Sequence, residues 1–251
     1  MEPRGHGFRG GYSQGQSKPK AKNNSVPDRW LDYSNFGRQI HGTPIVALKV
    51  PLRAVITESV EIANKVPEDK RFGPTDVLEQ IQNLGMVLDL TATQRYYDPQ
   101  FFMSQGIRYF KLVCEGRVIP GADTVRAFFA QMDGFRNDPG MRGCVIGVHC
   151  THGVNRTGYL ICRYMIQRLG LSAQEAIQKF EAARGHKIER PLYVDHLSEL
   201  GCTSVQPSPR YDGGSSFRGG AKVPCPKPAR SSMLGPLSTA KVGFNFKFLY
   251  Y

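Results

Sequence analysis

No apolar run in this sequence approaches the ~18 residues that a membrane-spanning helix needs, so we expect no membrane span. Cysteine is scarce, with six in 251 residues. No two cysteines form a CxxC pair, which argues against a zinc ribbon or a disulfide scaffold. The first 25 residues hold no apolar stretch, so a secretory signal is not expected either. These absences favour a reducing compartment, and we expect no metal and no other cofactor.

Acidic side chains are also in short supply, because 21 Asp and Glu face 33 Lys and Arg, giving a net charge of +12. Most of the basic excess lies in residues 1–25 and 203–251, which are rich in Gly, Pro and Ser. Such segments bury too little apolar surface to offset the entropy of ordering the chain. We therefore predict disordered basic tails at 1–25 and 203–251 and one folded domain at 26–202.

Both predicted tails contain the tetrapeptide Phe-Arg-Gly-Gly, at 8–11 and 217–220. Arg-Gly segments with aromatic residues suit RNA, because guanidinium groups stack on bases and pair with phosphates without a fixed fold. A solvated linker that contacts nothing specific is an equally good interpretation. The basic run at 18–22 fits a nuclear-import patch. Together with the family resemblance described below, the basic tails lead us to expect residence in the nucleus.

Within 26–202, short apolar runs alternate with stretches of helical periodicity. The pattern predicts strands over 85–90, 107–113 and 144–148. It predicts helices over 124–135 and 156–169, a third helix opened by a capping box between Ser172 and Glu175, and a fourth over 191–200. Alternating strands and helices indicate an α/β fold whose central, mainly parallel sheet is flanked by helices.

One segment, residues 148–158 with the sequence VHCTHGVNRTG, lies between a predicted buried strand and a predicted helix. Ligands of open α/β sheets bind at the carboxyl ends of the strands. A tight loop there points its N–H groups inward, and the next helix adds its positive end, so that together they bind phosphate. Glycine lets such a loop curl. The residues predicted to bind phosphate are Thr151, His152, Gly153, Val154, Asn155 and Arg156.

Cys150 and Arg156 stand at the two ends of this loop. A field that holds phosphate also stabilises a thiolate, so the pKa of Cys150 should fall from ~8.5 into the range ~3.5–7.5. The thiolate can attack phosphorus to form a phosphocysteine, while Arg156 stabilises the charge on the equatorial oxygens. Thr157 is expected to donate a hydrogen bond to the sulfur, with His149 and Asp89 supporting the loop. A buried cysteine without a catalytic role is the alternative interpretation.

The loop resembles the HCxxGxxR[ST]G signature of the cysteine-dependent phosphatases. It is most similar to their RNA 5′-triphosphatase branch, a group of atypical dual-specificity phosphatases. Further matching segments, at 27–33, 49–52, 89–97, 158–164, 184–186 and 189–190, span the predicted domain. The resemblance implies a dual-specificity-phosphatase-like fold and metal-independent removal of the γ- and then the β-phosphate from 5′-triphosphate RNA, leaving a 5′-monophosphate. It also implies RNA and ribonucleoprotein or splicing-factor partners; we expect a monomer.

Protein phosphatases of this kind carry an aspartic general acid on a loop that precedes the cysteine. The corresponding segment here, 113–123, offers only Glu115 and Asp123, and Asp123 is predicted to cap a helix. A phosphoanhydride needs the acid least, because its leaving group is already a stabilised anion. The weak acid segment therefore favours polyphosphate substrates. Candidate contacts to such a substrate are Arg95, Lys111, Arg117 and Arg190, with Arg163, Arg184 and His186 as further cations.

Two other functions stay open. The loop would hydrolyse aryl phosphates in any case, so the chain could be a protein phosphatase that acts on phosphotyrosine, phosphoserine and phosphothreonine. A catalytically idle RNA-binding adaptor that uses the basic tails is the other alternative. The intact Cys150 and Arg156 argue against idleness, and the lack of lysine in 151–155 argues against phosphoinositide substrates.

Overall fold

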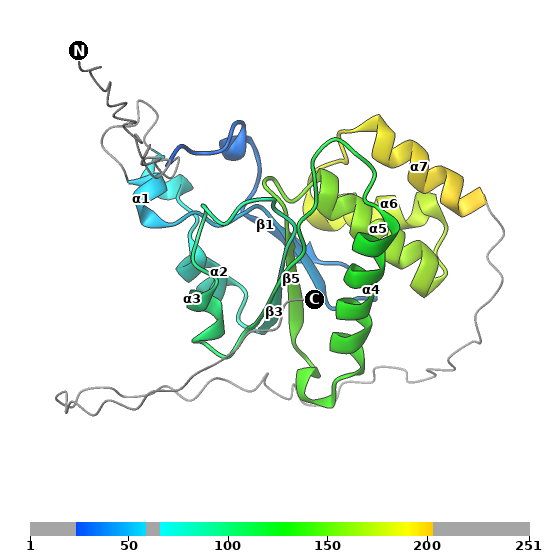
Figure 1. Ribbon diagram of the computed structural model, residues 1–251, viewed down its shortest axis with the longest axis horizontal. Coiled ribbons are helices and arrows are strands. Elements are labelled where there is room, and N and C mark those ends of the chain that lie inside the picture. The colour runs from blue at the N-terminus through cyan, green and yellow to red at the C-terminus, as the bar shows by residue number, and fades with distance from the viewer. Residues whose placement is uncertain (1–23, 59–65, 203–251) are drawn as a thin grey trace, which may run out of the picture.

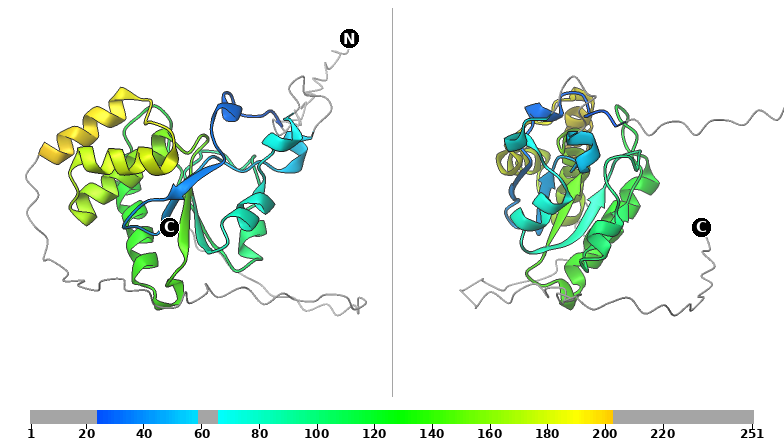
Figure 2. Two further views of the ribbon diagram at one scale, coloured as in Figure 1. Left: turned by 180° about the vertical axis from the view of Figure 1, so that it is seen from behind. Right: turned by 90° about the vertical axis from the view of Figure 1, so that its left-hand side faces the viewer.

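A computed structural model of the chain describes residues 24–58 and 66–202, and the two predicted tails fall almost wholly outside these ranges. Figures 1 and 2 show a twisted central sheet with helices on both faces. The strands are β1 (Phe36–Gln39), β2 (Ile45–Leu48), β3 (Leu84–Asp89), β4 (Arg108–Lys111) and β5 (Val145–His149). The helices are α1 (Ala54–Thr57), α2 (Pro74–Gln80), α3 (Gln100–Met103), α4 (Ala122–Asn137), α5 (Asn155–Leu169), α6 (Ala173–Arg184) and α7 (Pro191–Cys202), with short 3-10 turns at Trp30–Asp32, Glu68–Lys70 and Pro139–Met141. No helix in the described ranges is both long and apolar enough to cross a membrane.

The five strands lie in the order β1-β2-β5-β3-β4. β1 pairs antiparallel with β2, and the other three pairings are parallel. Leu48 of β2 and Asp89 of β3 are both opposite His149 of β5, and Asp89 is opposite Lys111 of β4. The carboxyl ends of four strands therefore meet at one edge of the sheet. The prediction of an α/β fold with a mainly parallel sheet is confirmed.

Two hydrophobic clusters fill the faces of the sheet. Ile146 of β5 belongs to the cluster beneath α4–α7, which includes Phe128 and Phe180. Val145, the neighbour of Ile146, belongs to the cluster beneath α1–α3, which includes Phe102. Every residue of β5 is buried, as expected for a central parallel strand covered on both sides. The strand that leads into the loop at 150–154 is therefore held rigidly by packing.

The predicted strands and long helices occur within one or two residues of their expected bounds, but two predicted helix caps are wrong in detail. Ser172 accepts a hydrogen bond from the N–H of Glu175, whereas the Glu175 side chain pairs with Lys179 (3.2 Å) instead of closing a capping box. Asp123 does not cap α4, because the helix begins at Ala122 and Asp123 pairs within its first turn with Arg126.

Candidate active site

The loop at 150–154 joins β5 to α5 at the carboxyl edge of the sheet, the upper end of β5 in Figure 1. Neighbouring segments hold both sides of it through backbone hydrogen bonds. The N–H of Leu90 donates to the carbonyl of His149 (2.8 Å), and the N–H of Val50 donates to that of Thr151 (3.1 Å). α5 begins directly after the loop at Asn155, so the positive end of its dipole faces the loop.

Gly153 permits a close approach between the loop and β2. Its φ is +66°, in the left-handed region that favours glycine. A Cβ on this residue would lie 2.1 Å from the carbonyl oxygen of Leu48 and 2.4 Å from its carbonyl carbon. No side chain fits there, so the loop needs glycine for space as well as for conformation.

Gly153→Ala is accordingly expected to lower the free energy of unfolding by at least about 3 kcal/mol, since left-handed strain of about 1–2 kcal/mol is joined by a backbone clash. Gly170→Ala is the matched control. Gly170 has φ +73° but no atom within 4 Å of an added Cβ, so it carries the strain alone. Urea unfolding measures both losses, and equal losses would contradict a loop pressed against β2.

Arg184, expected among the cations at the pocket mouth, is instead buried behind the loop with 1% exposure. Its Nε donates to the carbonyl of Gly153 and its Nη2 to that of His152, both at 3.0 Å, while Nη1 bonds to the hydroxyl of Ser34 (2.6 Å). Because the loop carbonyls turn toward this guanidinium, the loop N–H groups can face the opposite side. Burial lowers the pKa of Arg184 to about 10, so the side chain stays charged at neutral pH.

Cys150 lies at the floor of the pocket with 3% exposure. Burial alone would raise the pKa of its thiol, but the Arg156 guanidinium, the hydroxyl and N–H of Thr157 and the N–H of Gly153 outweigh it. The pKa of Cys150 therefore lies below the ordinary value, in the direction expected from the sequence. The buried Thr157 hydroxyl has no nitrogen or oxygen partner among the described residues, which leaves it for the sulfur. In contrast, burial raises the pKa of Cys114 to about 11.

Arg156 reaches the pocket from the first turn of α5. Its Nη1 donates to the carbonyls of Leu90 (3.2 Å) and Cys114 (2.8 Å), and its Nη2 donates to Oγ1 of Thr151 (3.1 Å). A guanidinium has five N–H donors, so these bonds leave Nε–H and the second Nη2–H. The two remaining donors lie on one edge of the group and can bind two oxygens of a phosphoryl group together.

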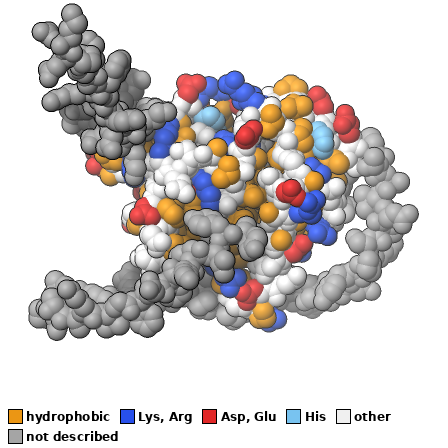
Figure 3. Space-filling view, viewed as in Figure 1, with side chains coloured by type: hydrophobic (Ala, Val, Ile, Leu, Met, Phe, Trp, Pro, Cys, Tyr) orange, Lys and Arg blue, Asp and Glu red, His pale blue; other side chains and the backbone are white. Residues whose placement is uncertain are grey.

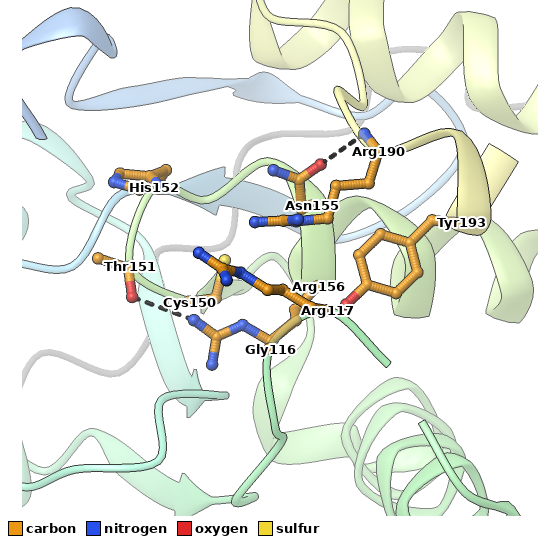
Figure 4. Close-up of a pocket in the computed structure, with 9 residues that line it drawn as sticks. All are labelled: Gly116, Arg117, Cys150, Thr151, His152, Asn155, Arg156, Arg190 and Tyr193. Carbon is orange, nitrogen blue, oxygen red and sulfur yellow. Dashed lines mark hydrogen bonds between the residues drawn. The ribbon is translucent and has the colours of Figure 1, made fainter. Parts of the chain in front are cut away.

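The other side chains predicted to bind phosphate are used mainly within the protein. The His152 ring stacks on Tyr33 with ring centroids 4.6 Å apart. Oδ1 of Asn155 accepts the backbone N–H of Arg190 (3.0 Å), which fixes the start of α7 beside the loop (Figure 4). Val154 is fully buried at the start of α5. Phosphate binding by residues 151–155 would therefore rely on their backbone N–H groups.

His149 and Asp89 belong to a buried polar network beneath the loop. Nδ1 of His149 lies 3.2 Å from the carbonyl oxygen of Cys150, and its Nε2 lies 2.6 Å from the Tyr97 hydroxyl. Burial holds the pKa of His149 below its ordinary value, so the ring is neutral at pH 7. Asp89 accepts a hydrogen bond from Nζ of Lys111 (2.8 Å). The network joins His149 to the backbone of Cys150, and the role of His149 and Asp89 in supporting the loop stays a prediction.

Figure 4 shows the resulting pocket, with Cys150 at its floor. The cavity measures about 210 Å³ and is lined by Gly116, Arg117, Cys150, Thr151, His152, Asn155, Arg156, Arg190 and Tyr193. Of the predicted substrate contacts, only Arg117 and Arg190 are in this lining. The expectation for Arg95 and Lys111 is not supported: Arg95 donates to the carbonyl of Ser25 (2.7 Å), and Lys111 is bound in the Asp89 network.

No carboxylate is in this lining. Glu115 is exposed on the segment above the pocket, and Asp123 is paired on the exposed first turn of α4. Within the described ranges, no cluster of three His, Cys, Asp or Glu side chains could hold a metal ion. Tyr193 was not predicted as a site residue, because it lies on a different helix and no local pattern connects it to the loop.

Residues 73–201 match the family described as "Dual specificity phosphatase, catalytic domain". The chain is 44% identical over 172 residues to putative tyrosine-protein phosphatase 1 of Orgyia pseudotsugata multicapsid polyhedrosis virus, which covers 68% of this chain and 74% of the viral protein. It is 39% identical over 197 residues to the human RNA/RNP complex-1-interacting phosphatase, covering 77% of this chain but 58% of that protein. The chain thus spans little more than half of the human relative.

Among solved structures, Tk-PTP in its active form is similar with a TM-score of 0.50 and 15% identity, covering 66% of this chain and 95% of that one. At this identity the likeness concerns the fold alone. The sequence relatives and the matching family confirm the resemblance inferred from the loop. The chain belongs to the dual-specificity phosphatase family, in the group that contains the RNA/RNP complex-1-interacting phosphatases.

Proposed function

We propose that this phosphatase removes the γ- and then the β-phosphate from 5′-triphosphate RNA, leaving a 5′-monophosphate, through a phosphocysteine intermediate. The observation that carries the proposal is the composition of the pocket, which combines Cys150 and Arg156 with two further arginines and no carboxylate. Such a pocket suits a substrate with several negative charges and a leaving group that does not need a proton.

In the proposed reaction the Cys150 thiolate attacks the terminal phosphorus, and an S–P bond forms as the bond to the bridging oxygen breaks. The loop N–H groups and the free edge of Arg156 hold the non-bridging oxygens, where charge accumulates. The shortened RNA leaves as a stabilised phosphate anion. Water then attacks the phosphocysteine, which releases inorganic phosphate and restores the thiolate for the next cycle.

Arg117 and Arg190 support a polyphosphate substrate, because they place two more cations in the lining of the pocket. The Arg190 backbone is fixed by Asn155, so its side chain starts from a defined position. Figure 3 shows Lys and Arg interspersed with Asp and Glu on the face in view, rather than gathered in one basic stripe. The human relative is named for its interaction with an RNA/RNP complex, which fits RNA as the substrate class.

The test compares kcat/KM of the full chain on 5′-triphosphate RNA and on a phosphotyrosine peptide. The proposal expects the higher value on RNA, and a higher value on the peptide would favour the protein phosphatase alternative. Arg190→Gln should lower the efficiency on RNA by a larger factor than on the peptide, because only the RNA has a second phosphate. Arg163→Gln is the matched control, since Arg163 bonds to Tyr159 and Gln167 on its own helix and does not line the pocket.

We expect Glu115→Gln and Asp123→Asn, alone or together, to lower kcat on 5′-triphosphate RNA by less than about tenfold. A general acid contributes ~10²–10⁴-fold, but neither carboxyl lines the pocket and the phosphate leaving group needs little protonation. Steady-state kinetics on RNA measures this directly. A loss for Asp123→Asn as large as that for a Cys150 variant would refute the argument that a phosphoanhydride substrate needs no general acid.

A further inference from the structure

Tyr193 contributes to the pocket a buried hydroxyl whose proton has no acceptor in the described part of the chain. The residue is fully buried on α7 and its ring packs against Tyr159, with centroids 5.2 Å apart. Its hydroxyl makes no hydrogen bond of normal geometry within the described part of the chain. Leaving such a group without a partner costs about 1–3 kcal/mol, so an unpaired hydroxyl in a packed helix interface needs a reason.

The surroundings of this hydroxyl leave its proton uncommitted. In Figure 4 the ring points from α7 toward Arg117, with its oxygen at the wall of the pocket that holds Cys150. The backbone N–H of Arg117 approaches the oxygen, and an N–H can only donate. The charged neighbours in the pocket lining, Arg117, Arg156 and Arg190, also lack acceptors. An anion that enters the pocket would supply the acceptor.

The proton stays on this hydroxyl under working conditions. Burial raises the pKa of Tyr193 above the ordinary value of tyrosine, so the side chain is a neutral phenol at neutral pH. A neutral hydroxyl is a donor to phosphate oxygens, whereas a phenolate would repel them. Tyr193 lines the same pocket as Cys150, so an oxygen of a phosphoryl group held there is the candidate acceptor.

We propose that the Tyr193 hydroxyl donates a hydrogen bond to an oxygen of the phosphoryl group held against Cys150, as a catalytic residue beside Arg156. No bond to the proton is broken; the hydroxyl is a fixed donor in the cage of N–H groups. Such a bond strengthens as charge accumulates on the oxygens in the transition state. Its removal should therefore lower kcat as well as weaken binding. The proposal rests on phosphoryl transfer at Cys150 and applies whether the leaving group is a phosphate or a phenol.

Tyr159 provides a matched control. It is as deeply buried as Tyr193 and touches it, but its hydroxyl is satisfied by Nη1 of Arg163 (2.7 Å) and lies 3.2 Å from Nδ1 of His196. Phenylalanine fits the space of either tyrosine, because the substitution removes only one oxygen. A purely structural role for Tyr193 therefore predicts similar behaviour of the two variants.

The experiment measures kcat, KM and inhibition by orthovanadate for the full chain and for Tyr193→Phe and Tyr159→Phe, with p-nitrophenyl phosphate as substrate. We expect Tyr193→Phe to lower kcat/KM about 10- to 100-fold, chiefly in kcat, and to weaken vanadate inhibition. Tyr159→Phe should stay within about threefold. The thermal midpoint of Tyr193→Phe should be no lower than that of the wild type, since an unpaired buried hydroxyl is removed.

Unchanged kinetics in Tyr193→Phe, an equal loss in Tyr159→Phe, or a loss of activity that accompanies a lowered thermal midpoint would each overturn the proposal. The kinetics on 5′-triphosphate RNA, described above for the proposed function, keep the test of Tyr193 separate from the test of that function. A wild-type chain that fails on RNA rejects that function, whereas the comparison on p-nitrophenyl phosphate still decides the role of Tyr193.

Discussion

Cys150→Ser is expected to lower kcat on every phosphate substrate by at least about 10⁴-fold, to or below the limit of detection. The pocket stabilises an anion on the sulfur through Arg156, Thr157 and the N–H of Gly153. A serine hydroxyl does not ionise near neutral pH, and none of these groups can accept its proton. The variant should still bind phosphate, because the loop N–H groups and Arg156 are unchanged.

Cys162→Ser is the control for this loss. Cys162 lies on α5 and is also fully buried, but burial raises the pKa of its thiol well above the ordinary value. The thiol donates a hydrogen bond to the carbonyl of Ala176 (3.5 Å). We expect its kcat to stay within about tenfold of the wild type. Retention of more than about one hundredth of the activity by Cys150→Ser would exclude a cysteine nucleophile.

Arg156→Lys is expected to lower kcat by about 10²–10³-fold although it preserves the charge. The guanidinium donates to Leu90, Cys114 and Thr151 and still has two parallel donors for the phosphoryl group. An ammonium has three donors on one nitrogen and cannot reach the scaffold and two phosphoryl oxygens together. The substitution therefore tests geometry rather than charge.

Arg163→Lys on the same helix is the comparison, because that side chain bonds to Tyr159 and Gln167 outside the pocket lining. It should leave kcat and KM within about twofold of the wild type. An Arg156→Lys enzyme within about tenfold of the wild type would show that a positive charge alone suffices and would remove the argument for bidentate binding.

The parts of the fold that sequence analysis predicted are those whose signal is local. β5, the loop and α5 follow one another along the chain, and the apolar strand, the glycine and the helix periodicity each act over a few residues. β2 was missed although Ile45–Leu48 is fully buried, because a four-residue apolar run is too short to distinguish a strand from a buried turn. Its burial depends on β1 and β5, which come from other parts of the chain.

The site residues also divide into those with a local signal in the sequence, which were predicted, and those placed by contacts between distant segments, which were not. Cys150 and Arg156 share one loop, so their spacing was visible in the sequence. Arg184 was expected among the cations at the pocket mouth, and its position behind the loop was not predicted. It is buried because the fold brings the carbonyls of Gly153 and Ser34 together around it. Tyr193 depends in the same way on the packing of α7 against α5, which no local pattern encodes.

The most direct test of this account is the pH dependence of alkylation of Cys150 by iodoacetate, followed by mass spectrometry of the peptide that contains it. The pKa of Cys150 is lowered in the folded chain, so the account predicts a midpoint below the ~8.5 of a free thiol and protection by orthovanadate. Unfolding the chain in urea should return the midpoint to ~8.5 and abolish the protection. A folded-state midpoint at or above ~8.5, or alkylation that vanadate does not slow, would contradict a thiolate held in a phosphate-binding loop.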